Sequence, residues 1–326
     1  MRSKVLTATG AVAAGASALA YAAYRKDIAA AKQRIDDEAL LIDPAFGAIE
    51  FGEWGDGPAV LVVHGAGGGF DQGLDLGRAL LGDGYRIIAP SRFGYLGAAL
   101  PADASAEAQA EAHLRLLDAL QLDAVPVIGV SAGAPSAMQL CLKHPERCTA
   151  LVLMVPMAWA PARPSADAPS PFFEAVLNTI AASDFLFWTA TKVARMTLVQ
   201  TILGTPVMNY RNASPDERRH VDRLLHSILP ISRRFAGIRN DGLVSGNLTR
   251  YALEEIRVPT LVISASDDLY GTYESSVYTA KKIPNARFRG FVSGGHLLLG
   301  HGTEVRSQVT GFVAEQLEGK RTAIAV

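Results

Sequence analysis

The residues most able to do chemistry form the pentapeptide Gly129-Val130-Ser131-Ala132-Gly133. Residues 125–129 predict a buried strand before it, and residues 133–143 predict a helix after it. A strand-to-helix turn of this G-x-S-x-G type presents the serine hydroxyl, and its glycines admit the neighbouring backbone. The free N–H groups of the helix N-terminus favour developing negative charge. The motif therefore predicts Ser131 as a nucleophile.

A glycine-rich loop, His64-Gly65-Ala66-Gly67-Gly68-Gly69, follows the apolar run at residues 59–63. Phe70 stands where the last glycine of a dinucleotide-binding motif belongs, and the loop has no lysine for a phosphate. We interpret the segment as an oxyanion loop that offers the backbone N–H of Ala66. The second donor would be the N–H of Ala132, directly after the nucleophile. His64 itself is expected to be structural.

A general base and its acid partner are expected after two late strands. His296 follows the predicted strand at 287–291, and Asp267 and Asp268 follow the one at 260–264. An imidazole can take the proton of Ser131, while a carboxylate holds the ring in the correct tautomer. Because the carboxyl ends of parallel strands share one edge of a sheet, these side chains should converge.

Composition narrows the class of protein. The 326 residues contain 31 Lys and Arg against 32 Asp and Glu, which argues against a nucleic-acid binder. A hydrophobic fraction of 49% excludes a disordered chain. Two cysteines exclude a disulfide framework and a cysteine-only metal site. We expect no metal and no cofactor, since four histidines lack partners at metal spacing: His113, His144, His220 and His226. His301 falls at the start of the last predicted helix and is expected to be structural.

Short apolar runs alternate with helical patterns from about residue 46. This rhythm predicts a mostly parallel sheet with helices on both faces. It breaks after a Pro-rich stretch, where helical patterns at 172–183, 185–203, 214–229 and 231–239 predict an inserted helical cap. The aromatic side chains of this region should form the cap's own core, and a few of them should line a pocket.

The N-terminal segment differs from the rest of the chain, because residues 5–24 carry no charge. As a helix they would span about 30 Å, the thickness of a bilayer's hydrocarbon core. Arg2 and Lys4 precede them and Arg25-Lys26 follow, which favours an uncleaved single-pass membrane anchor with weakly set orientation. The alternatives are a signal peptide cleaved near Ala18-Leu19-Ala20, leaving an exported protein, and a peripheral helix packed on the domain.

The predicted organisation has six parts. They are an anchor or signal helix (1–24), a charged linker helix (25–45), the first part of the core (46–156), the helical cap (157–256), the second part of the core (257–318) and a tail (319–326).

Together these motifs resemble the α/β-hydrolase superfamily of serine hydrolases, from about residue 47 to residue 317. The resemblance implies an α/β fold with a mostly parallel sheet and a helical cap. It implies Ser131 as nucleophile, Asp268 as acid and His296 as base. Asp268 is preferred to Asp267 because the family usually has a small residue three positions before the acid, here Ala265.

Two departures from the family pattern matter. Arg92 stands where the family often carries an acid, and it should form a structural ion pair or steer an anionic substrate. The serine at the elbow disfavours the branches with an aspartate nucleophile, such as dehalogenases and epoxide hydrolases.

The sequence therefore predicts a serine hydrolase that cleaves a small or medium carboxylic ester through an acyl-enzyme. The expected substrate is an apolar small molecule. A carbon–carbon bond hydrolase of the same fold is the alternative enzyme. Its substrate carboxylate could bind Arg92 or the cap arginines Arg233, Arg234 and Arg239. A non-catalytic ligand-binding module is the alternative from another functional class. The predicted anchor also permits a hydrolase that acts on lipids.

Overall fold

A central sheet forms the core of the computed structural model, which describes residues 2–42, 48–161, 179 and 182–324. Within these residues eight strands lie in the order β1-β2-β4-β3-β5-β6-β7-β8. The strands β3 to β8 run parallel, whereas β1 and β2 are antiparallel to their neighbours. The bounds are β1 (Leu40–Ile42), β2 (Ile49–Trp54), β3 (Ala59–Val63), β4 (Arg86–Pro90), β5 (Val125–Val130), β6 (Cys148–Met154), β7 (Thr260–Ala265) and β8 (Ala286–Phe291).

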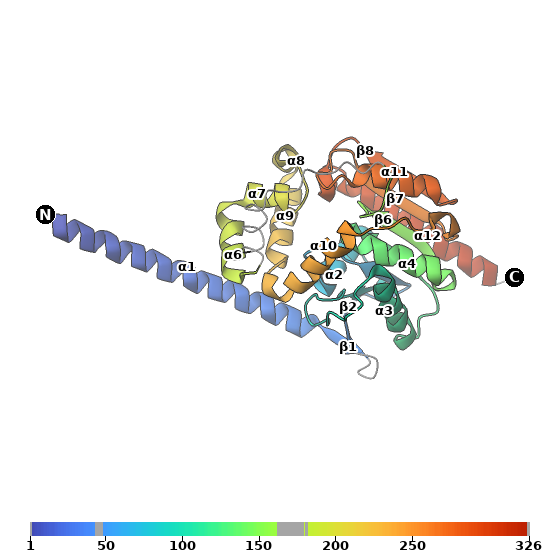
Figure 1. Cartoon of the computed structure of the whole chain (residues 1–326), viewed down its shortest axis with the longest axis horizontal. Helices are drawn as coiled ribbons and strands as arrows, with labels where there is room; N and C mark the ends of the chain where they lie inside the picture. Colours follow the sequence, from blue (N-terminus) through green and yellow to red (C-terminus); the bar gives the residue numbers. More distant parts are fainter. Residues whose placement is uncertain (1, 43–47, 162–178, 180–181, 325–326) are drawn as a thin grey trace.

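Helices cover both faces of this sheet, as the alternation of elements predicts (Figure 1). In β3 the side chains of Val60 and Val62 pack with α2 (Phe70–Leu81) and α12 (Gly302–Ile324) on one face. Leu61 and Val63 point to the other face, where they join α3 (Ala106–Ala119), α4 (Ala134–Lys143) and the end of α11 (Thr272–Lys282). Both faces of the parallel strands are therefore buried, which explains their continuous apolar runs.

The cap lies between β6 and β7 in the chain and has an apolar cluster of its own. This cluster includes Phe187, Trp188, Val199 and Leu225. The described cap helices are α6 (Asp184–Val193), α7 (Arg195–Thr201), α8 (Val207–Asn212), α9 (Pro215–Ser227) and α10 (Phe235–Gly246).

Two of the predicted cap helices differ in detail from the helices that the structure shows. The pattern at 185–203 forms two helices, because Ala194 leaves the helical region with φ −126°. The pattern at 231–239 begins with a short 3-10 turn, Ile231–Arg233, and continues as α10. The helix predicted at 172–183 lies almost wholly outside the described residues, as does most of the Pro-rich stretch.

The N-terminal helix α1 (Arg2–Glu38) is continuous from the uncharged segment into the charged one (Figure 1). The linker helix expected over residues 25–45 ends at Glu38, and Leu40–Ile42 pair with β2 at the edge of the sheet. The charged part of α1 packs on the body. Ile28 joins the apolar cluster of the cap, Ile35 joins the cluster of α2 and α12, and Arg34 pairs with Asp71 at 3.1 Å.

The membrane anchor is predicted for residues 1–24. Most of it lies outside the described side chains, because those of residues 1–14 and 16 are not described. In the part of the chain that the structure describes, no helix is both long and apolar enough to cross a bilayer. The anchor stays a prediction.

If residues 25–38 are part of the folded body, removing a buried side chain there should destabilise the whole protein. Ile35 is 1% exposed, so Ile35→Ala should lower the free energy of unfolding by about 3 kcal/mol. Leu41, which is 68% exposed on β1, is the matched control, and Leu41→Ala should change it by less than about 0.5 kcal/mol. Urea unfolding measures both, and equal small effects would show that α1 is only a tether.

Candidate active site

Ser131 lies at a sharp turn between β5 and α4. Its φ of +51° is in the left-handed region, a conformation that costs a side chain about 1–3 kcal/mol. The two motif glycines make this turn possible. A Cβ at Gly129 would lie 2.6 Å from the Cβ of Ala137, and one at Gly133 would lie 2.4 Å from the carbonyl oxygen of His64. The serine is thus held where β5, α4 and the glycine-rich loop approach most closely.

His296 lies between Ser131 and Asp268. Its Nε2 is 2.8 Å from the Ser131 Oγ, and its Nδ1 is 2.8 Å from the Asp268 Oδ2. The buried carboxylate of Asp268 also accepts hydrogen bonds from the hydroxyl of Thr272 and from the backbone N–H of Tyr270. Because the carboxylate only accepts, Nδ1 donates to it and Nε2 is free to accept from the serine hydroxyl.

The neighbouring aspartate has a different position. The carboxylate of Asp267 accepts from the backbone N–H groups of Gly294 and Gly295, at 3.3 Å and 2.8 Å, and from the amide of Asn209 at 2.6 Å. It therefore stabilises the turn that leads into His296. Of the two candidates for the acid, the structure brings Asp268 to the imidazole.

The glycine-rich loop lies against the serine. A Cβ on Gly65 would be 3.3 Å from the Cβ of Ser131, and Ala66 lines the same cavity as the serine. Ala132 follows Ser131 in the 3-10 turn Ser131–Gly133 that leads into α4. The two residues predicted to supply N–H groups to an oxyanion are thus next to the serine.

The buried Arg92 holds the carbonyl groups of this loop. Its guanidinium donates to the carbonyl oxygens of His64 and Gly65, at 3.0 Å and 3.1 Å, and forms a two-pronged pair with Asp241 of α10 at 2.5 Å and 2.7 Å. The structural ion pair expected for Arg92 is confirmed. Its partner is 149 positions away, and sequence reasoning missed it.

Two more buried side chains attach the loop to the cap. The hydroxyl of Tyr95 accepts from the N–H of Gly67 and donates to Asp241. Burial and the Asp241 carboxylate raise the pKa of Tyr95 well above its ordinary value, so the phenol keeps its proton. Arg234 donates to the carbonyl oxygen of Gly68 and pairs with Asp71 at 2.7 Å. We call Asp71, Arg92, Tyr95, Arg234 and Asp241 the loop clamp.

The buried His64 is neutral and structural, as expected. Burial and the charge of Arg92 lower the pKa of His64 well below its ordinary value. Its Nε2 accepts from the backbone N–H of Arg92 at 3.0 Å, so its Nδ1 carries the proton and donates to the carbonyl oxygen of Gly65 at 2.7 Å. It thus joins two loops rather than titrating near the serine.

His113 contacts the nucleophile turn through Ser136. It lies 3.2 Å from the hydroxyl of Ser136, which donates to the carbonyl oxygen of Gly133. Complete burial and the positive charge of Arg92 lower the pKa of His113 to about 3. The ring is therefore neutral at any pH near 7.

A cavity of about 440 Å³ opens over Ser131 and His296. Most of its lining is apolar, with Leu76, Ala79, Val130, Met154, Val155, Ile202, Leu203, Leu224, Leu297 and Leu298 among its walls. Gln72 and Asp75 of α2 and His220 and Arg223 of α9 add polar groups. The site can hold a largely apolar molecule with one polar end.

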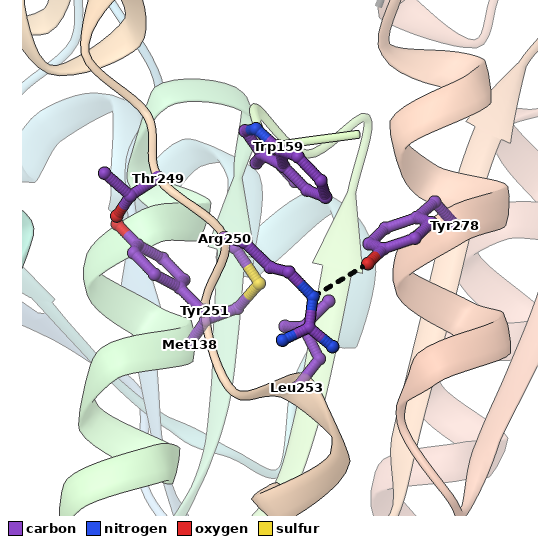
Figure 2. A pocket seen from close by; sticks show the side chains of 8 residues that line it. Met138, Trp159, Thr249, Arg250, Tyr251, Leu253 and Tyr278 are labelled. Carbon is purple, nitrogen blue, oxygen red and sulfur yellow. Dashed lines mark hydrogen bonds between the residues drawn. The ribbon is translucent and has the colours of Figure 1, made fainter. Parts of the chain in front are cut away.

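A second hollow, next to Trp159 and Tyr251, is too small for a substrate. Its volume of about 10 Å³ corresponds to about one water molecule. Figure 2 shows Arg250 reaching across it to the hydroxyl of Tyr278, to which its Nε donates at 3.2 Å.

The other residues considered from the sequence have structural partners. His301 stacks on Phe291 just before α12. Cys141 and Cys148 are buried free thiols. Arg233 pairs with Asp36 of α1. Within the described residues no group of three or more His, Cys, Asp and Glu side chains is arranged to hold a metal ion.

Comparisons with known proteins agree with this geometry. A sequence-family model described as alpha/beta hydrolase fold matches residues 58–204. The structure superposes on an alpha/beta hydrolase fold protein from Nakamurella multipartita with a TM-score of 0.67 and 25% identity, over 84% of this chain and 98% of the other. The chain has the α/β-hydrolase fold.

Curated relatives match over a shorter stretch of the chain. An uncharacterised hydrolase of Bacillus subtilis is 36% identical over 107 residues, which is 33% of this chain and 37% of the relative. A 2-hydroxymuconate semialdehyde hydrolase of a Pseudomonas strain is 32% identical over 104 residues, 31% of this chain and 37% of the relative. The matches thus span little more than a third of these relatives' length.

The loop clamp makes a prediction about stability. Asp241→Asn leaves Arg92 buried without its counter-charge and should lower the free energy of unfolding by about 3 kcal/mol or more. Glu315→Gln is the matched control, since Glu315 forms a similar two-pronged pair with Arg287 on the surface. Its cost should stay below about 1 kcal/mol. Equal costs in urea unfolding would contradict the role assigned to the clamp.

The neutral His113 predicts a pH dependence. Its pKa of about 3 in the folded state lies below the unfolded value of about 6.5, so acid favours the unfolded chain. Stability present above pH 6.5 should be lost toward pH 3, at up to about 1.4 kcal/mol per pH unit for this histidine. His113→Leu should reduce the slope between pH 6 and pH 4 by about that amount. An unchanged slope would mean that His113 takes up its proton in the folded protein.

Proposed function

We propose that this protein is a serine hydrolase that cleaves carboxylic esters of small or medium size through an acyl-enzyme. One observation carries the proposal. His296 lies 2.8 Å from both the Ser131 hydroxyl and the Asp268 carboxylate, and Ser131 and His296 face a mostly apolar cavity of about 440 Å³.

In the first half of the reaction the Oγ of Ser131 attacks the ester carbonyl carbon while His296 Nε2 takes the hydroxyl proton. Asp268 stabilises the imidazolium that forms. The carbonyl oxygen becomes an oxyanion and accepts from the N–H groups of Ala66 and Ala132, each worth about 2.7–4 kcal/mol in the transition state. The carbon–oxygen bond then breaks, and His296 gives its proton to the leaving alcohol.

In the second half water attacks the acyl-serine. His296 takes a proton from the water, the same two N–H groups stabilise the second oxyanion, and the serine leaves with that proton. The products are a carboxylic acid and free enzyme. The loop clamp keeps Ala66 in position throughout, because it holds the carbonyl groups on either side of that residue.

The carbon–carbon bond hydrolase is the second candidate, since relatives carry the names of such enzymes. That reaction would need a cation for the substrate carboxylate. Arg92, Arg233 and Arg234 are each paired with an aspartate. Among the described residues that line the cavity, the arginine is Arg223. A substrate carboxylate that raises activity, with Arg223→Met removing the gain, would favour this candidate over the ester hydrolase.

The proposal predicts rapid labelling of the full chain by a fluorophosphonate probe, and no labelling of Ser131→Ala. Asp268→Asn should slow labelling about 10³–10⁴-fold, because the imidazole loses its orienting charge. Ser266→Ala is the control, since Ser266 is exposed and its hydroxyl donates to the carbonyl oxygen of Val292; this variant should label as the wild type does.

Hydrolysis of a small p-nitrophenyl ester provides a second readout that a closed cap would not block. If the folded wild type reacts with neither the probe nor the ester, the hypothesis of a non-catalytic binding module replaces that of a hydrolase. If Ser131→Ala labels as fast as the wild type, another nucleophile is at work.

A further inference from the structure

The described N-terminal part of α1 extends beyond the rest of the protein (Figure 1). Gly15 and all residues from 17 to 23 are exposed, although their sequence SALAYAA is almost wholly apolar. Contact with the body begins at Tyr21, whose ring faces that of Phe185 although the residue is 52% exposed, and Ile28 is buried. The described side chains before Tyr21 are therefore mostly apolar and exposed.

A helix that is apolar on all sides is stable when something apolar surrounds it. In the sequence this segment continues back to residue 5 without a charge. Twenty helical residues would span about 30 Å. Arg25 and Lys26 begin the charged part of the helix where the uncharged part ends.

Aromatic side chains of α6 contact α1 at this point. The ring of Phe185 in α6 lies 5.1 Å from that of Tyr24 and 6.4 Å from that of Tyr21, and Trp188 lies 5.8 Å from Tyr24. The indole N–H of Trp188 donates to Asp27 at 2.8 Å. Tyrosine and tryptophan with an apolar body and a satisfied polar end are typical of the boundary between a bilayer and water.

The outward face of the cap helix α6 is apolar as well. Phe185, Leu186 and Val193 are 41%, 40% and 79% exposed, whereas Phe187 and Thr191 on the opposite side are buried in the cap. In Figure 1, α6 stands at the edge of the body from which α1 projects. Lys192 is exposed on the same helix, beside Asp27 of α1.

We propose that α6 rests on the surface of a lipid bilayer that residues 5–24 of α1 enter. We call Tyr21, Phe185, Leu186 and Val193 the membrane face. The cations of Arg25, Lys26 and Lys192 lie at its boundary, where anionic headgroups attract them. A second copy of the chain would cover the helix too, but it would not require a ring of aromatic and basic residues where the uncharged segment ends. The bilayer thus accounts for both the exposed helix and the exposed cap face, whatever reaction Ser131 performs.

An environment-sensitive fluorophore on the full chain tests whether α6 touches lipid. Both native cysteines are buried, so an introduced cysteine is the accessible thiol. Val193→Cys carries the fluorophore on the membrane face, and Val292→Cys is the control, since Val292 is 87% exposed in the loop after β8. With vesicles of phosphatidylcholine and phosphatidylglycerol, emission at position 193 should shift to shorter wavelength while that at 292 stays unchanged. If the protein binds the vesicles and neither probe shifts, the membrane face is wrong.

Vesicle flotation tests whether α1 enters the bilayer. Ala18→Glu with Ala22→Glu puts two charges into the uncovered segment and should reduce flotation more than about tenfold. Ala29→Glu with Ala30→Glu adds the same charge at exposed positions past Arg25-Lys26 and should preserve flotation. Equal loss in both pairs would indicate a charge effect alone. A wild type that stays in the lower fractions as a dimer would make a second copy the occupant, and either result overturns the proposal.

Discussion

The site depends on one constraint, which is that Ser131 adopts a left-handed backbone conformation where three segments meet. The strain is stable because Gly129 and Gly133 let α4 and the glycine-rich loop approach within distances that a Cβ would forbid. The 3-10 turn Ser131–Gly133 leads from the serine into α4, so the N-terminus of this helix lies close to the hydroxyl. Nucleophile, loop and helix are therefore one geometric unit.

The loop clamp extends this unit into the cap. Buried guanidinium groups satisfy carbonyls of the glycine-rich loop, and their counter-charges come from different parts of the fold: Asp241 from the cap and Asp71 from α2. Asp71 also pairs with Arg34 of α1. Because a buried charge without its partner is costly, movement of the cap is coupled to the loop that holds Ala66. The N-terminal helix is linked to the same network through a single carboxylate.

Local patterns predicted most of the fold because strands and short turns depend on neighbours in sequence. The strand before Ser131 and the positions of Asp267, Asp268 and His296 after two late strands follow from such patterns. Contacts between distant segments did not follow from them. The pairing of Arg92 with Asp241 joins positions 149 residues apart, and the packing of Ile35 on the body depends on a tertiary surface. The break between α6 and α7 at Ala194 was also missed, because no proline or glycine marks it in the sequence.

The most direct test of the account is a crystal structure of the protein after reaction with a dialkyl p-nitrophenyl phosphate. Phosphorus should be bonded to the Oγ of Ser131, and a phosphoryl oxygen should lie about 2.7–3.1 Å from the backbone nitrogens of Ala66 and Ala132. His296 should remain between the adduct and Asp268. A phosphorylated residue other than Ser131, or a phosphoryl oxygen that points away from both nitrogens, would contradict it.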